Sequence, residues 1–307
     1  MNNRTNLEYT KFKVLELELH SEFEIIRDGE FVLTHYATSD VKSSLCFVEN
    51  EGYAIKASKN ENISVIITTP ELGVHIDSNK GLILTEKPKR LFFEIHNQLS
   101  KPYSFDKKET LIAKSADIAS TAIIGDGVII GERTKVGEYT VIEDGSIIGD
   151  DVLIENHVTI GGRGMHNTKI DNTFFHVLDL GNVIIKDKAE ILSQAVIQKP
   201  YFYHSTIIGK ETRISVGCNI GHGCLVGDRC LIAGHSIIAG YCKIGKDVWI
   251  GPNCTITHMI NIDDYSNVLL GSVLIEDLKK SEIVSGNFAL DHAKKLKSYI
   301  REKREKK

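Results

Sequence analysis

Aliphatic residues recur at every sixth position along most of the chain after residue 111. The run is clearest from Ile214 to Ile256. There a small residue stands four positions after nearly every aliphatic residue, and glycine often occupies the position directly after the aliphatic residue. Neither an amphipathic helix, with its period of 3.6 residues, nor an isolated strand, with its period of two, gives this spacing. A six-residue repeat predicts a β-helix, whose coils stack into one long core.

The repeat starts near Ile112 and continues without a slip to Ile160. If each hexapeptide forms one flat face, three of them close a triangular coil of 18 residues, and aliphatic residues stack on neighbours about 4.8 Å away. We expect the glycines that follow the aliphatic residues to lie at corners that need a positive φ. The period breaks over residues 162–182, predicted as an inserted loop, and slips by one residue over 198–204.

Residues 1–105 lack the repeat. Ile63–Thr68 is a β-branched run typical of a strand, and Pro88–Leu99 begins with proline and has apolar residues at helical spacing. We therefore expect a small α/β domain over residues 1–105 and the β-helix over 106–280. A charged tail over 281–307 predicts a helix that covers the strand edges of the last coil. The fold class is mainly β.

Composition limits the classes of binding partner that are expected. The formal net charge is −4, so no global attraction to nucleic acid or to an anionic membrane is expected. No apolar run reaches the ~20 residues of a membrane span, and the N-terminal segment lacks the apolar core of a signal peptide. These features favour the cytoplasm.

Five of the six cysteines occupy the small-residue position of the repeat, and Cys46 stands apart. A zinc site is one reading, but the sequence has no CxxC pair. We expect these cysteines to be small residues that face the core, with no metal bound. Free thiols suit a reducing compartment.

Two histidines share one phase of the repeat. His222 and His258 lie 36 positions apart, with Gly240 midway between them in the same column. A hexapeptide-repeat β-helix resembles a superfamily whose members are usually acyltransferases. Acyl transfer from a thioester to an amine needs a base that removes the amine proton, and histidine suits this near neutral pH. It also needs donors for the oxyanion, which a backbone N–H can supply. The alternative is that both histidines are ordinary corner residues.

The stretch NIGHGCLVGDRCLIAGHSIIAG (219–240) resembles the catalytic region of the UDP-3-O-acylglucosamine N-acyltransferases of lipid A biosynthesis, a family of hexapeptide-repeat left-handed β-helix enzymes. In that family a Q-I-A-H-N histidine is catalytic, which places this role on His222. The resemblance also places the oxyanion N–H on Gly240. CTITHM (254–259) matches a second family histidine, so His258 would contact the donor arm or the acceptor.

A third match lies in the N-terminal region. FVENEGY (47–53) supplies Phe47, Asn50 and Tyr53 at the spacing of the F-x-x-N-x-x-Y motif with which the family holds uracil. Two rings can clasp a flat base, at about 1–3 kcal/mol per stacked base, and Asn can bond its edge. The alternative is packing aromatics with an Asn in a turn.

The resemblance covers nearly the whole chain. It implies a homotrimer with sites between neighbouring subunits, a UDP-linked amino sugar as acceptor, and a 3-hydroxyacyl group carried on the phosphopantetheine of acyl carrier protein. No bound cofactor is implied.

Three departures leave alternatives open. QKPYFYH (198–204) replaces the family's D-R-G element, and RGMHN (163–167) replaces D-G-F-G-Y. Within the loop, Met165, His166 and His176 are candidates to reach into the site of a neighbouring subunit. The tail is shorter than the family segment that helps dock acyl carrier protein. A nucleotide-sugar N-acetyltransferase of surface polysaccharide synthesis that uses acetyl-CoA or another acyl-CoA is therefore an alternative. A non-enzymatic trimeric scaffold or binding module is another.

Overall fold

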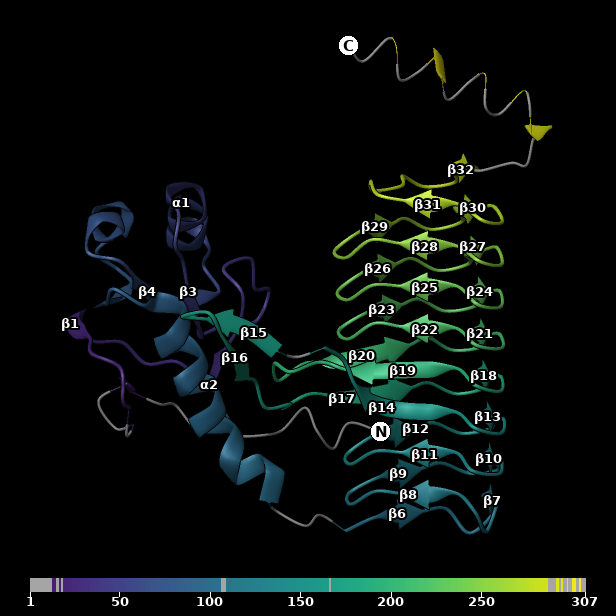
Figure 1. Cartoon of the computed structure of the whole chain (residues 1–307). Helices are drawn as coiled ribbons and strands as arrows, with labels where there is room; N and C mark the ends of the chain where they lie inside the picture. Colours follow the sequence, from purple (N-terminus) through teal and green to yellow (C-terminus); the bar gives the residue numbers. More distant parts are fainter. Residues whose placement is uncertain are drawn as a thin grey trace. The chain divides into compact units, whose positions relative to one another are not determined.

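The computed structural model describes residues 13–14, 17, 19–105, 109–165 and 167–286, and positions 291–292, 294, 297, 300–301 and 304 of the tail. The chain forms two compact units (Figure 1). The first unit comprises Met1–Thr110, Gly161–Val183 and Lys199–Thr206, and the second comprises Leu111–Ile160, Ile184–Gln198 and Ile207–Lys307.

The first unit holds a five-stranded sheet in the order β1-β5-β4-β3-β2. Its strands are β1 (Glu24–Arg27), β2 (Leu33–Thr34), β3 (Ser44–Phe47), β4 (Ile63–Thr68) and β5 (Gly81–Leu84). β1 is antiparallel to β5, and the other neighbours are parallel. The strand expected at Ile63–Thr68 is confirmed as β4.

Among the described residues, the helices beside the sheet include α1 (Glu51–Lys59), the 3₁₀ helix η2 (Glu71–His75) and α2 (Pro88–Phe105). The side chain of Asn50 caps α1, because its oxygen accepts the Tyr53 N–H at 3.0 Å. α2 begins at proline, whose fixed φ suits the first helical position, and it runs six residues beyond the predicted Leu99.

The described residues of the predicted loop belong to the first unit. It contains a hairpin of β15 (Asn167–Ile170) and β16 (Thr173–His176). Asp171 accepts from Lys87 at 2.9 Å and pairs with Arg90 at 3.0 Å, while Asn97 on α2 donates to the His176 carbonyl at 2.8 Å. The segment is therefore anchored to α2 and to Lys87, which immediately precedes it.

The second unit consists of three sheets of short parallel strands (Figure 1). The first sheet contains β6 (Leu111–Ile112), β9 (Ile129–Ile130), β12 (Ile147–Ile148), β17 (Asn182–Ile185), β20 (Ser205–Ile208), β23 (Leu225–Val226), β26 (Lys243–Ile244) and β29 (Asn261–Ile262). The second contains β7 (Asp117–Ile118), β10 (Lys135–Val136), β13 (Leu153–Ile154), β18 (Glu190–Ile191), β21 (Arg213–Ile214), β24 (Leu231–Ile232), β27 (Trp249–Ile250), β30 (Asn267–Val268) and β32 (Ile283–Val284). The third contains β8 (Ile123–Ile124), β11 (Val141–Ile142), β14 (Thr159–Arg163), β19 (Val196–Lys199), β22 (Asn219–Ile220), β25 (Ile237–Ile238), β28 (Thr255–Ile256) and β31 (Val273–Leu274).

The chain visits the three sheets in turn, and strand partners such as Ile214 and Ile232 lie 18 residues apart. The repeat aliphatic residues from Ile130 onward are buried along the axis. This parallel architecture is typical of a left-handed β-helix, and the predicted fold class is confirmed. We name the turns by their order: the first corner follows the first sheet, the second corner the second, and the third corner the third.

Two excursions into the first unit interrupt the coils, both at the third corner. Across the first, Ile148 pairs with Ile185, 37 positions later and therefore 19 more than one coil. Across the second, Ile191 pairs with Ile214, 23 positions later, so five residues are inserted. The one-residue slip in phase predicted over 198–204 is therefore an insertion of five residues, because five added residues shift a six-residue phase by one step.

The prediction for the glycines was also wrong. Positive φ occurs three positions after the aliphatic residue, and most residues there are not glycine, as at Arg229 (φ 56°) and Tyr241 (φ 60°). Glycine directly after the aliphatic residue serves close stacking instead. A Cβ on Gly227 would lie 2.5 Å from the Gly245 carbonyl oxygen of the next coil. Its absence lets the coils approach.

The small residues of the repeat close the core. All five repeat cysteines are buried free thiols, as expected. The sequence did not show that they also donate: the Cys218 thiol contacts the Ala233 carbonyl at 3.1 Å, and Ser236 donates to the Gly251 carbonyl at 2.8 Å. Cysteine and serine thus fill equivalent positions because each offers a small donor to the next coil.

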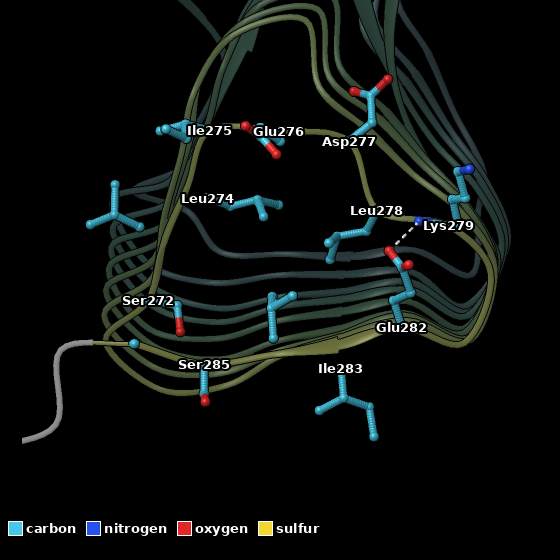
Figure 2. Close-up of a pocket in the computed structure, with 13 residues that line it drawn as sticks. Ser272, Leu274, Ile275, Glu276, Asp277, Leu278, Lys279, Glu282, Ile283 and Ser285 are labelled. Carbon is cyan, nitrogen blue, oxygen red and sulfur yellow. Dashed lines mark hydrogen bonds between the residues drawn. The ribbon is translucent and has the colours of Figure 1, made fainter.

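The last coil ends later than predicted. β32 still pairs with β30, so the coils extend to Val284 rather than to residue 280. Figure 2 shows this open end, where Leu274 and Leu278 point into a cavity of about 740 Å³. The described tail positions His292, Lys294, Lys297, Ile300, Arg301 and Arg304 are helical, and the rest of the predicted tail helix lies outside the described residues.

Within the described part of the chain, no helix is both long and apolar enough to cross a membrane.

Candidate active site

Several corners of the β-helix are closed by aspartate. At the first corner, the Lys210 N–H donates to the Asp228 carboxylate of the next coil at 2.8 Å. At the third corner, the coil nearest the N-terminal end of the β-helix (the lower end) has the same arrangement, since the Asp126 N–H donates to Asp144 at 2.8 Å. The donor is always two positions after the aliphatic residue. A charge-assisted hydrogen bond of this kind satisfies a backbone N–H that is not used in strand pairing.

The upper coils of the third corner depart from this pattern. Strand register places His222, Gly240 and His258 on three consecutive coils at the position that aspartate takes elsewhere. The Gly240 carbonyl accepts from the Met259 N–H at 3.0 Å, but among the described residues the Gly240 N–H donates no hydrogen bond. The three residues that the sequence analysis placed in one column are therefore aligned on consecutive coils in the structure.

His222 lies against Gly240. The imidazole is half-buried, and a Cβ on Gly240 would lie 2.5 to 2.7 Å from its Cε1, Nε2 and Nδ1 atoms. Any larger residue would displace the ring. Nδ1 is shielded from solvent. A base next to an uncommitted N–H donor is the pair that acyl transfer requires.

Two neighbours of this pair were missed from the sequence. The Tyr241 ring meets the His222 ring edge to face, with centroids 5.1 Å apart at 78°. A Cβ on Gly223 would lie 2.6 Å from the Tyr241 ring. The available signal was the spacing of 18 residues between Gly223 and Tyr241, which stacks them on adjacent coils.

The other corner histidines differ in setting. His258 is exposed on the coil above Gly240. His235 belongs to the second corner, where its ring lies over Gly217. His222 and His235 are thus both packed against a glycine of an adjacent coil, but only the His222 position has a second ring, Tyr241, beside it among the described residues.

The N-terminal motif lies in the first unit at the junction of β3 and α1. Phe47 is half-buried and packs on Phe92 with centroids 4.9 Å apart. Asn50 caps α1, and Tyr53 is 49% exposed on its first turn with the Lys56 ammonium 5.3 Å from the ring centroid. The motif therefore leaves one ring open to a ligand, while Phe47 and Asn50 also have structural roles.

Of the loop candidates Met165 and His166, the structure describes Met165. Met165 is 91% exposed, and His166 lies outside the described residues. Over the part of the chain that the structure describes, no group of three or more His, Cys, Asp or Glu side chains is placed to hold a metal ion.

One segment of the chain matches a known protein family. Residues 127–162 match the family described as "Bacterial transferase hexapeptide (six repeats)", so this segment carries the hexapeptide repeat of bacterial transferases. A search of curated protein sequences finds no match.

Several solved structures are similar. A UDP-N-acetylglucosamine O-acyltransferase from Moraxella catarrhalis RH4 is 25% identical, over 62% of this chain and 76% of that one, with a TM-score of 0.38. A UDP-N-acetylglucosamine acyltransferase from Francisella novicida is 21% identical over 62% and 71%, with a TM-score of 0.48. The Arabidopsis UDP-N-acetylglucosamine acyltransferase is 22% identical over 57% and 71%, at 0.39. Because each score lies below 0.5, we base the proposed function on the repeat and on this chain's own side chains.

Proposed function

We propose that the protein is an acyltransferase in which His222 acts as general base and the Gly240 N–H stabilises the oxyanion. The observation that carries this proposal is the third corner. There the imidazole lies against a glycine whose N–H has no partner among the described residues, at a position that aspartate closes in other coils. The hexapeptide repeat of bacterial transferases in residues 127–162 supports the same class.

The chemistry is transfer of an acyl group from a thioester to an amine. The amine nitrogen attacks the thioester carbonyl, and His222 accepts the proton that the nitrogen loses. Negative charge develops on the carbonyl oxygen, where the Gly240 N–H donates to it. The C–S bond then breaks, and the leaving thiolate takes up a proton as the carbonyl re-forms. One well-placed oxyanion donor contributes about 10²–10³ in kcat, and a general base about 10²–10⁴.

For the substrates, we propose a UDP-linked amino sugar as acceptor and a 3-hydroxyacyl group on acyl carrier protein as donor, in a homotrimeric enzyme. The support is the resemblance of residues 219–240 and 47–53 to the UDP-3-O-acylglucosamine N-acyltransferases, together with the exposed ring of Tyr53. The uracil would stack on Tyr53, and His258 would contact the phosphopantetheine arm.

A matrix of donors and acceptors tests this proposal. Acetyl-CoA and 3-hydroxyacyl-carrier proteins would each be paired with UDP-glucosamine, its 3-O-acyl form and other UDP-amino sugars, and products read by mass spectrometry. We expect a 3-hydroxyacyl amide on the 3-O-acyl sugar. An acetyl amide would instead assign a CoA-dependent N-acetyltransferase, and no product with any pair would contradict acyl transfer.

Nucleotide binding separates an enzyme from a bare scaffold. Tyr53→Ala should weaken UDP binding about 5- to 150-fold, which corresponds to the 1–3 kcal/mol of one stacked base. Phe174→Ala is the matched control, because Phe174 is also an exposed ring with a lysine ammonium nearby, Lys169 at 5.6 Å, but lies outside the motif. Calorimetry that shows no UDP binding to the wild type would remove the uridine role.

A further inference from the structure

Tyr241 is the neighbour of His222 that the proposed mechanism leaves without a role. Its ring stands edge to face with the imidazole, 5.1 Å between centroids. Its hydroxyl oxygen and the His222 Nδ1 atom are both shielded from solvent. We propose that Tyr241 is a positioning residue, whose ring holds the His222 imidazole in the orientation that presents Nε2 to the acyl acceptor. This inference rests on the proposed function.

The two rings are interlocked through two glycines. The His222 ring reaches up to Gly240 on the next coil, and the Tyr241 ring reaches down to Gly223 on the coil below. A side chain at either glycine would meet the opposing ring at 2.5 to 2.6 Å. Each ring therefore occupies the space that the other coil leaves open, and together they fill the corner.

The backbone reinforces this arrangement. Tyr241 has a positive φ of 60°, and its N–H donates to the His222 carbonyl at 2.8 Å. Both residues are thus tied at the backbone and again at the ring. Residues with a Cβ adopt positive φ at some cost, and asparagine would be easier to accommodate here. The tyrosine ring is consistent with a packing role that offsets this cost.

The contact restricts the imidazole. A general base must lie within hydrogen-bond reach of the proton it removes, so a freely rotating ring would spend part of its time unproductive. An edge-to-face pair of rings is favourable enough to bias an orientation by about 2- to 12-fold. Loss of Tyr241 should therefore lower kcat by about this factor, with little change in the KM of either substrate.

The chain offers a matched control. Tyr139 stands at the equivalent position of the second corner, with a φ of 56°, and its ring also packs on a histidine, His157, with centroids 5.2 Å apart. Tyr139→Asn removes the same ring from the same backbone conformation, away from His222.

The experiment compares Tyr241→Asn, Tyr241→Phe and Tyr139→Asn with the wild type, by steady-state kinetics and by the rate at which diethyl pyrocarbonate modifies His222, read by peptide mass spectrometry. Thermal melts confirm that each variant is folded. We expect Tyr241→Asn alone to lower kcat about 2- to 12-fold and to speed modification of His222. Tyr241→Phe should match the wild type in both measurements, because it keeps the ring.

Three results would overturn the positioning role. One is a kcat for Tyr241→Asn equal to that of Tyr139→Asn. Another is a loss in Tyr241→Phe as large as in Tyr241→Asn, which would assign the effect to the hydroxyl. The third is an unchanged modification rate of His222 in Tyr241→Asn. If the wild type transfers no acyl group at all, the proposed function fails by itself, and the modification rates alone decide whether the ring shields His222.

Discussion

At the third corner of the β-helix, the coils near the N-terminal end differ from those nearer the C-terminal end. In its lower coils the Asp126 N–H is closed by the Asp144 carboxylate at 2.8 Å. In its upper coils the equivalent positions are His222, Gly240 and His258, and the carboxylate is missing. The strand register and the backbone bonds between coils are the same at both ends: Gly145 donates to the Asp126 carbonyl at 2.9 Å, and Tyr241 to the His222 carbonyl at 2.8 Å.

The difference separates scaffold from chemistry. The repeat supplies corners with the same backbone hydrogen bonds at regular intervals. Changing the side chains at one position of successive coils therefore changes the chemistry of the corner and leaves the coil intact. Where aspartate accepts the N–H, the corner is closed. Where glycine and histidine replace it, an N–H donor and an imidazole become available side by side.

Among the changes that break this comparison, the largest expected effect comes from giving the His222, Gly240 and His258 coils the carboxylate that closes the Asp126 coil. His258→Asp places a carboxylate where other coils have one, so it should accept the Gly240 N–H and remove it from the oxyanion. We expect kcat to fall about 10²–10³-fold with unchanged or higher thermal stability. The control is His258→Ala, which removes the same side chain but cannot accept the N–H. Equal kcat for the two variants would contradict the oxyanion role of Gly240.

A pair of glycine variants sharpens the comparison. At Gly227 an added Cβ meets a backbone carbonyl oxygen 2.5 Å away, which cannot move without separating the coils. Gly227→Ala should therefore lower the free energy of unfolding by about 1–3 kcal/mol and leave the kcat of folded enzyme unchanged. At Gly240 the added Cβ meets the His222 ring, which can swing aside. Gly240→Ala should lose activity with a smaller loss of stability, as measured by denaturant unfolding and kinetics on the same samples. The reverse ranking would contradict this assignment.

The smallest effect concerns acid stability of the closed corners. A bidentate ion pair with Arg229, at 2.6 and 2.7 Å, lowers the pKa of Asp247 from its ordinary 3.8, mainly through the hydrogen bond. Because the unfolded chain takes up this proton first, the pair stabilises the fold above about pH 3.8 and the benefit is lost as pH falls through the lowered pKa. Asp247→Asn should therefore reduce the fall in melting temperature between pH 5 and pH 3. An identical fall in variant and wild type would show that the pair contributes nothing.

Much of the β-helix could be predicted because its determinants are local and periodic. Each aliphatic residue from Ile130 to Val268 must face the axis, and the period alone identifies that face. The second excursion was hidden, since five inserted residues such as Pro200–His204 mimic a slip of one. The reason for the glycines was also hidden, because close approach of Gly227 to Gly245 depends on the neighbouring coil and not on local φ.

The site could be predicted in outline. The column of His222, Gly240 and His258 follows from a spacing of 18 residues, which the repeat fixes. The interlock of Tyr241 with Gly223 could not be read in the same way, because ring direction depends on side-chain packing. At the N-terminal motif, spacing identified Asn50 but not that its side chain caps α1; the helix itself was missed.

The most direct test of the central claim compares two corner histidines. His222→Ala and His235→Asn each remove an imidazole that lies against a glycine of an adjacent coil, and asparagine suits the positive φ of 59° at residue 235. The single-turnover rate of amide formation would be measured for both variants and the wild type with the productive donor and acceptor. We predict a loss of about 10²–10⁴-fold for His222→Ala and a rate near wild type for His235→Asn, with both proteins folded. A His222→Ala enzyme as active as His235→Asn would contradict the assignment of the third corner as the active site.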